Sequence, residues 1–181
     1  MSRIGKKPVI IPKGVEISIK GTVFSAKGPK GQLSKDLPGE VTIKHEEDKV
    51  VFSIPENSNK PVRAKFGLVR ALVNNMIIGV HTGFTRGLEI VGVGYKAQNQ
   101  GDSKIQLNVG YSHPVIYQAP DFVTLKVEGN KVFVNGVDKE AVGQTASEIR
   151  KVRPPKHYKD GAGIRYLGEN VRIKVGKKLA A

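Results

Sequence analysis

The chain has 181 residues, with 30 Lys and Arg side chains against 16 Asp and Glu, so its formal net charge is +14 at pH 7. It contains no cysteine, which excludes disulfide frameworks, thiolate metal sites and cysteine nucleophiles. No apolar run approaches the roughly 18–20 residues that cross a bilayer, and Pro12 ends the short run 9–11. We therefore expect no membrane association and no signal peptide, and a cytoplasmic protein.

The first half of the chain predicts several strands followed by one helix. Alternating and β-branched residues indicate strands at 15–20, 22–26, 32–35, 41–45 and 50–54. Asn59 is placed to cap a helix and Pro61 lies in its first turn. Apolar residues then recur at helical spacing as far as Gly79, where we expect the helix to end.

The second half predicts the same succession of elements. Strands are expected at 88–97, 105–109, 114–117, 123–127 and 132–134, and a further basic strand at 171–175. Asp138 is placed to cap a helix, which ends after Arg153 because Pro154 cannot continue it.

An internal repeat underlies this similarity. Residues 38–50 and 120–132 align at an offset of 82, with seven of the thirteen positions identical. The expected class is therefore α+β: two tandem duplicated modules, 1–82 and 83–181, each an antiparallel sheet with one helix packed on a face, plus basic N- and C-terminal extensions. Two linked modules gain avidity if one partner engages both, although a duplicated chain can also bind through one copy only.

The positive charge is concentrated at the two ends of the chain. Residues 1–13 carry four basic side chains and no acid, and residues 148–181 carry ten against three acids. The stretch between them is close to balanced. Segregated charge favours a polyanion such as nucleic acid over the alternative of a general solubility charge. We expect residues 2–7 and 176–181 to become ordered only on such a partner.

The stretch 149–166 combines cations, tyrosines and glycines. Its Lys and Arg side chains can neutralise phosphates, and Tyr158 and Tyr166 can stack on unpaired bases. Gly161 and Gly163 allow the backbone to approach a phosphate closely. The alternative is a solvated cationic loop whose tyrosines pack on the sheet.

Other motifs point away from catalysis. The glycines of 92–96 are followed by no helix, and those of 28–31 lack the spacing of a phosphate-binding loop. The four His residues show no metal-ligand spacing, and no nucleophile, base and orienting group fall together. We expect no catalytic residue, no metal and no cofactor.

Four segments together resemble the bacterial-type ribosomal protein L6 family of the large subunit. They are residues 1–8, 67–76, 92–95 and the block from Arg153-Pro154-Pro155 to Gly163-Ile164-Arg165-Tyr166. The resemblance implies a non-enzymatic protein that binds large-subunit ribosomal RNA near the sarcin–ricin loop and the stalk base, where translational GTPases dock. It also implies a monomer lying among neighbouring ribosomal proteins.

The resemblance and the charge distribution together nominate a set of RNA-binding residues. They are Ser2, Arg3, Lys6, Lys7, Arg70, Lys151, Arg153, Pro154, Lys156, His157, Tyr158, Lys159, Gly163, Arg165, Tyr166, Arg172, Lys174, Lys177 and Lys178. The chain departs from the family pattern at 157–164, where the loop is one residue longer and carries Asp160 in place of a cation. We expect Asp160 to cap the loop or to pair with Lys159, pointing away from RNA.

Two other functions share this composition. A free-standing RNA chaperone differs from a ribosomal protein in not cofractionating with ribosomal subunits. An enzyme acting on RNA requires an acid–base or metal constellation that the sequence does not show.

Overall fold

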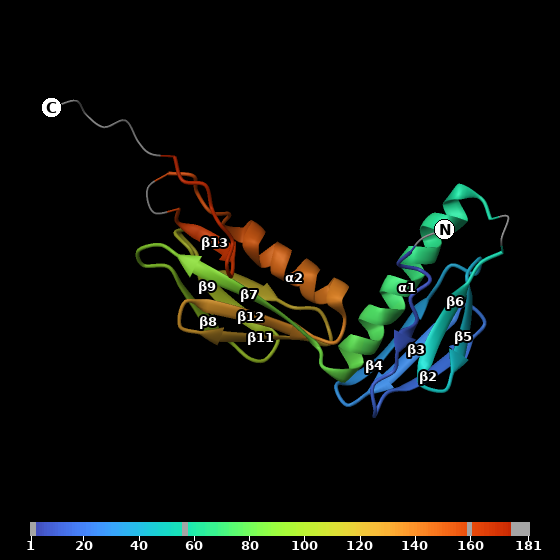
Figure 1. Ribbon diagram of the computed structural model, residues 1–181. Coiled ribbons are helices and arrows are strands. Elements are labelled where there is room, and N and C mark those ends of the chain that lie inside the picture. Colours follow the sequence, from blue (N-terminus) through green and yellow to red (C-terminus); the bar gives the residue numbers. More distant parts are fainter. Residues whose placement is uncertain (1–2, 56–57, 159–160, 175–181) are drawn as a thin grey trace. The chain divides into compact units, whose positions relative to one another are not determined.

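The computed structural model describes residues 3–55, 58–158 and 161–174 (Figure 1). The chain divides into two compact units. The first holds the residues up to Gly83 together with Val137–Lys139, and the second holds 84–136 and the residues from Glu140 onward. None of the helices in the described ranges is long and apolar enough to cross a membrane.

The first unit contains two three-stranded antiparallel sheets and one helix. One sheet has the order β2-β3-β4, from β2 (Glu16–Lys20), β3 (Val23–Gly28) and β4 (Gly31–Asp36). The other has the order β1-β6-β5, from β1 (Val9–Ile10), β6 (Lys49–Ser53) and β5 (Thr42–Glu46). β1 was not among the expected strands.

Helix α1 (Lys60–His81) packs on both sheets of the first unit. It buries one stripe at helical spacing, including Phe66, Val69 and Val73, against the sheet residues Phe24 and Val50. Asn59 is the N-cap residue as expected, but its side chain makes no capping hydrogen bond. The helix ends at His81, two residues beyond the expected end.

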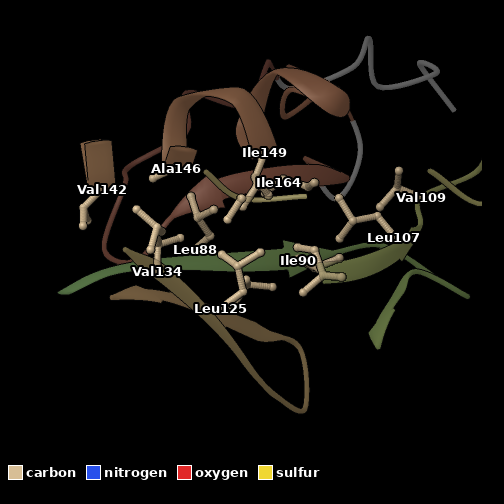
Figure 2. Packing of buried hydrophobic residues seen from close by; sticks show 14 residues of the cluster. Leu88, Ile90, Leu107, Val109, Leu125, Val134, Val142, Ala146, Ile149 and Ile164 are labelled. Atoms are coloured by element: carbon tan, nitrogen blue, oxygen red, sulfur yellow. The ribbon is translucent and has the colours of Figure 1, made fainter. Parts of the chain in front are cut away.

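The second unit repeats this plan and adds one strand. A four-stranded sheet has the order β11-β12-β7-β13, from β11 (Val123–Glu128), β12 (Lys131–Gly136), β7 (Phe84–Val91) and β13 (Gly163–Tyr166). A three-stranded sheet has the order β10-β9-β8, from β10 (Val115–Gln118), β9 (Lys104–Asn108) and β8 (Lys96–Asn99). Helix α2 (Lys139–Val152) lays Ile149 over Ile164 and Leu88 of the larger sheet (Figure 2).

The predicted duplication is confirmed in the topology. Glu46 pairs with Lys49 at the end of the β5–β6 hairpin, and Glu128 pairs with Lys131, 82 residues on, at the end of β11–β12. The order β1-β6-β5 recurs as β7-β12-β11, and β2-β3-β4 recurs as β8-β9-β10. The α+β class is therefore correct, with two sheets in each unit instead of the expected one.

The expectation of one strand over 88–97 is wrong. The chain forms β7 and β8 in different sheets, with residues 92–95 as a loop between them. Gly92 has φ +149° and Gly94 has φ +76°, conformations that end an extended strand. The alternation of side chains on either side of the loop hid this break.

The segment 163–174 also differs from the prediction. Residues 163–166, expected as a loop, form β13 and pair with β7, whereas the described part of the expected strand at 171–175 is not a strand. Gly163 is required at the start of β13, because a Cβ atom there would lie 2.6 Å from the Pro154 oxygen and from the Pro155 Cα atom.

The N-terminal arm also differs from the prediction. We expected it to become ordered only on a partner. Residues 3–6 form turns, and the Lys7 N–H donates to the Ile4 carbonyl at 3.2 Å. Gly5 is buried against the ring of Phe66 on α1. The arm is ordered because its glycine fits directly onto the helix.

Candidate nucleic-acid interface

The backbone of 153–157 anchors the candidate RNA-binding segment of the second unit, which the structure describes at residues 151–158 and 161–174. The Ile164 N–H donates to the Arg153 carbonyl at 2.7 Å, and the Lys174 N–H donates to the His157 carbonyl at 2.8 Å. Two prolines, 154 and 155, lie between these bonds and have no N–H to satisfy. The extended run after α2 therefore holds β13 and the tail, residues 167–174, in fixed positions.

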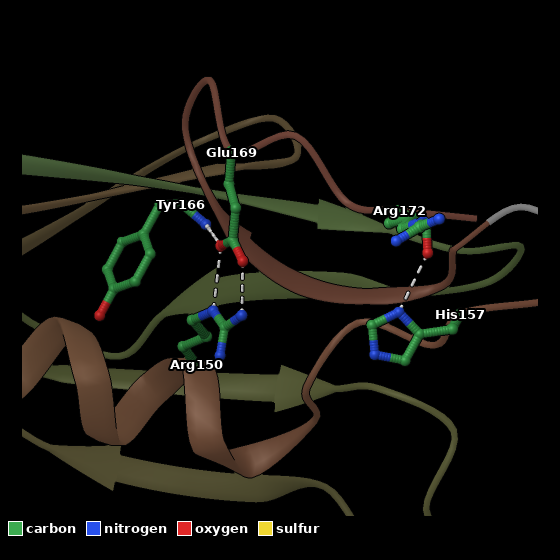
Figure 3. Close-up of polar contacts among 5 residues, drawn as sticks. All are labelled: Arg150, His157, Tyr166, Glu169 and Arg172. Carbon is green, nitrogen blue, oxygen red and sulfur yellow. Dashed lines mark hydrogen bonds and ion pairs between the residues drawn. The ribbon is translucent and has the colours of Figure 1, made fainter. Parts of the chain in front are cut away.

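His157 adds a side-chain bond to the same tail. Its Nδ1 atom lies 3.1 Å from the Arg172 carbonyl oxygen (Figure 3). Donation to a carbonyl requires that Nδ1 carry the proton. Arg172 is exposed at the surface while its backbone carbonyl is engaged by His157.

Arg150 and Glu169 form a bidentate ion pair that closes the turn after β13. The Arg150 Nε and Nη2 atoms donate to the two Glu169 oxygens at 3.0 and 2.5 Å, and the Tyr166 N–H donates to Glu169 at 2.9 Å (Figure 3). The pair is about three-quarters buried. Hydrogen bonds from Arg150, and then from the Tyr166 backbone, lower the pKa of Glu169 despite partial burial.

The ring of Tyr166 is enclosed by cations of the protein itself. The guanidinium of Arg86 lies 4.7 Å from the ring centroid and that of Arg150 lies 5.5 Å from it. Such contacts stabilise an aromatic ring through its electron-rich face. Tyr166 is therefore occupied within the unit, which favours a structural role over the predicted stacking on RNA.

Arg165 is also engaged within the protein. Its Nε atom lies 3.0 Å from a carboxylate oxygen of Glu89, the residue paired with it across β13 and β7. Both side chains are only about one-quarter exposed. This arginine is less available to a phosphate than its sequence context indicates.

Arg153 lies against two tyrosines. Its guanidinium carbon is 4.9 Å from the centroid of the Tyr111 ring. Hydrogen bonds with Tyr111 and Tyr95 raise the pKa of Arg153. Tyr111 donates its hydroxyl to the Val152 carbonyl at 2.8 Å, at the end of α2.

Gly163 is buried at the start of β13, and the other remaining candidates of the second unit that the structure describes lie on its surface. Tyr158 is 60% exposed, with the Lys174 ammonium 5.8 Å from its ring centroid. The exposed residues of the predicted set are Lys151, Pro154, Lys156, His157, Tyr158, Arg172 and Lys174. Of these, Lys151, Lys156, Arg172 and Lys174 give the described part of the segment 151–174 its accessible positive charge.

A second basic group lies in the first unit. Arg3, Lys6 and Lys7 are exposed on the arm, and the Arg70 Nε atom on α1 donates to the Lys7 carbonyl at 3.4 Å. Arg70 thus holds the arm that presents the other three cations.

Several predictions fall outside the described residues. They are Ser2, Lys159, Lys177 and Lys178 from the predicted set, together with the partner expected for Asp160. Their roles stay predictions.

Sequence reasoning missed the acidic and aromatic partners that hold the segment. Tyr111 bonds to the end of α2, 41 residues further on, while Glu89 and Arg86 on β7 contact residues of β13 more than 70 positions later, and no local spacing marks them. Arg150 and Glu169 could have been paired only by knowing that β13 forms a strand and turns back over α2.

Fold and site together define a class of protein: a duplicated α+β protein with an accessible cationic surface and no catalytic constellation among the residues the structure describes. Within those residues, no group of three or more His, Asp or Glu side chains could hold a metal ion.

Comparison with known proteins identifies the family. The sequence matches the family described as Ribosomal protein L6 over residues 11–83 and 91–166. It is 54% identical to large ribosomal subunit protein uL6 of Moorella thermoacetica over 178 residues, which cover 98% of this chain and 96% of the relative. It is 53% identical to the protein of the same name from Synechococcus and 52% identical to that of Listeria monocytogenes, at 97% and 98% coverage of those relatives.

The chain belongs to the ribosomal protein L6 family. The two matched stretches correspond to the two copies of the repeat. Family membership confirms the resemblance drawn from the sequence and the prediction of a structural ribosomal protein of the cytoplasm that is not an enzyme.

Proposed function

We propose that this chain binds large-subunit ribosomal RNA near the sarcin–ricin loop and the stalk base, and so supports subunit assembly and translation. The observation that carries the proposal is the cationic surface of residues 151–158 and 161–174, where backbone hydrogen bonds tie the run after α2 to β13 and to Lys174 without a partner. A preorganised surface loses less conformational entropy on binding than a flexible tail does.

The charges on this surface fall into two groups. Arg150 and Arg165 hold the segment together through Glu169 and Glu89, and the exposed cations Lys156, Arg172 and Lys174 face solvent. Only the second group is available to release counterions from phosphates, which is the main source of affinity for RNA.

The arm cations and Arg70 of the first unit form a second, separate contact. We propose that both units contact RNA, with the chain acting as a monomer beside neighbouring ribosomal proteins and close to where translational GTPases dock. The proposed division between the modules lies at residues 82 and 83.

Sedimentation of a cell lysate through a magnesium-containing gradient tests the assignment. We expect stoichiometric recovery of the chain with the large subunit and the whole ribosome, retained after a moderate-salt wash. Footprinting of the RNA on those particles should then show protection at the sarcin–ricin loop and the stalk base. Recovery only at the top of the gradient would instead favour a free-standing RNA chaperone.

A further inference from the structure

Tyr111 is a surface tyrosine of the second unit that lies outside the segment 151–174. Its side chain is 50% exposed, and its hydroxyl donates to the Val152 carbonyl at 2.8 Å. This bond ties the far end of the side chain to the end of α2. The exposed part of the ring is therefore held in one orientation instead of rotating freely.

One face of this ring is covered by the guanidinium of Arg153, at 4.9 Å from the ring centroid. The Arg153 Nε atom is buried and has no hydrogen-bond partner within the described part of the chain. A buried donor without a partner costs free energy. The contacts with Tyr111 and Tyr95 therefore hold the guanidinium on the Tyr111 ring although one of its donors stays unpaired.

Tyr95 fixes the loops around this pair. A Cβ atom on Gly92 would lie 2.8 Å from the Tyr95 ring, and one on Gly110 would lie 2.9 Å from the Tyr95 hydroxyl oxygen. Two glycines therefore let Tyr95 pack against both loops. Val93, at the tip of the first loop, is 96% exposed.

We propose that Tyr111 is a stacking platform for one unpaired RNA base, so that the RNA interface extends from 151–174 onto the loops 92–95 and 110–113. The inference rests on the proposed function. A fixed aromatic ring with a cation on one face and an exposed surface is suited to stacking against a base. Any of the four bases can stack on it, because each has a flat π face.

The surroundings favour a nucleotide over an apolar protein surface. The loop 110–114 reads Gly-Tyr-Ser-His-Pro and contains no acid, and the exposed cations Lys151 and Lys156 flank Arg153 in the chain. All five tyrosines of the chain lie in this unit. Phosphates on either side of a stacked base would meet positive charge.

The test uses the full-length chain and purified bacterial large-subunit ribosomal RNA. Ultraviolet cross-linking followed by mass spectrometry should find a nucleotide attached to Tyr111. Tyr111→Ala should weaken binding about 5- to 100-fold, the loss typical of one stacked base. Tyr111→Phe keeps the ring and should lose much less.

The salt dependence separates stacking from a role in positioning Arg153. Stacking releases no counterion, so Tyr111→Ala should lower the affinity and leave the slope of log K against log salt unchanged. If Tyr111 only positions Arg153, the same variant should flatten that slope by about one contact, as Arg153→Ala would.

Phe122→Ala is the matched control. Phe122 is an exposed aromatic of the same unit, and its carbonyl lies beside Gly136, just before α2 begins. Tyr111 is bonded to the other end of this 14-residue helix, about 20 Å away. The control should bind like the wild type. Wild-type affinity for Tyr111→Ala, a flattened slope or no adduct on Tyr111 would overturn the inference. A wild-type chain that does not bind this RNA would overturn the proposed function as well.

Discussion

Gly163 is the residue on which the geometry of the candidate segment depends most directly. It has φ +152°, and a Cβ atom there would lie 2.6 Å from backbone atoms of Pro154 and Pro155. Because backbone cannot rotate aside as a side chain does, Gly163→Ala must displace β13 or the run 153–155. We expect a loss of about 2–3 kcal/mol in the free energy of unfolding, measured by urea denaturation.

Gly168 is the control for this substitution. It also has positive φ, +80°, but no atom lies within 4 Å of an added Cβ. Gly168→Ala should therefore cost only the backbone strain, about 1 kcal/mol. Equal losses at the two positions would contradict the close approach inferred at Gly163.

Glu169 makes the folding stability of the second unit depend on pH. Its pKa is lowered in the folded protein, chiefly by the hydrogen bonds from Arg150. A carboxylate with a depressed folded pKa contributes stability that is present above its unfolded pKa, about 4.3, and is lost as the pH falls through the folded value.

Glu169→Gln should remove this contribution. At pH 7 the variant should be less stable by about 1–2 kcal/mol, since it loses charge-assisted hydrogen bonds. Below about pH 4.3 the difference from the wild type should shrink, because the unfolded wild-type chain then takes up a proton that the folded chain binds only at lower pH. Urea denaturation at several pH values measures both effects. A difference that stays constant down to pH 3 would show that the ion pair does not set the pH dependence.

At the scale of elements, the N-terminal arm is held in place by its packing against α1. Gly5 is buried, and a Cβ atom on it would overlap the ring of Phe66, which is itself buried. Gly5→Ala should push the arm off the helix, so that amide exchange at 4–10 becomes faster. Lys6→Ala, at an exposed position, should leave exchange unchanged. Unchanged exchange in Gly5→Ala would mean that the Phe66 ring moves aside.

Elements defined by local sequence were predicted well, and those defined by distant partners were not. The β5–β6 and β11–β12 hairpins and both helices follow from alternation, turn residues and helical spacing. β13 has only four residues and is a strand because β7, more than 70 positions earlier, supplies its hydrogen bonds. No local signal carries that information.

In the candidate site, too, the sequence predicted the local features and missed the contacts between distant residues. The exposed cations Lys156 and Arg172 were predicted from charge and from the family resemblance. The pairing of Arg165 with Glu89 depends on the register between β13 and β7, and the contact of Arg153 with Tyr111 depends on two loops meeting at the end of α2. Composition therefore identified the segment, and only the fold separates cations that hold it together from cations that face solvent.

At the scale of the whole molecule, the duplication shows where the second unit departs from the first. The strand orders of the two units correspond, and the addition in the second unit is β13 with the chain that flanks it. The same addition carries most of the accessible positive charge of the C-terminal region. A shared scaffold with a basic N-terminal arm and one charged C-terminal extension accounts for a basic protein whose middle is nearly neutral.

This division of charge predicts how binding to large-subunit ribosomal RNA responds to salt. Each phosphate contact contributes roughly −0.7 to −0.9 to the slope of log K against log salt. The double variant Lys156→Ala/Arg172→Ala removes two exposed cations and should flatten the slope by about 1.5.

Arg165→Ala should flatten the slope by less than half a unit, since this arginine already pairs with Glu89, and should instead lower the free energy of unfolding. Lys126→Ala removes an exposed lysine paired with Glu128 on β11, away from the segment, and serves as the control that leaves the slope unchanged. Equal flattening by Arg165→Ala and by one exposed lysine would show that the Glu89 pair opens on RNA and that Arg165 contacts a phosphate directly.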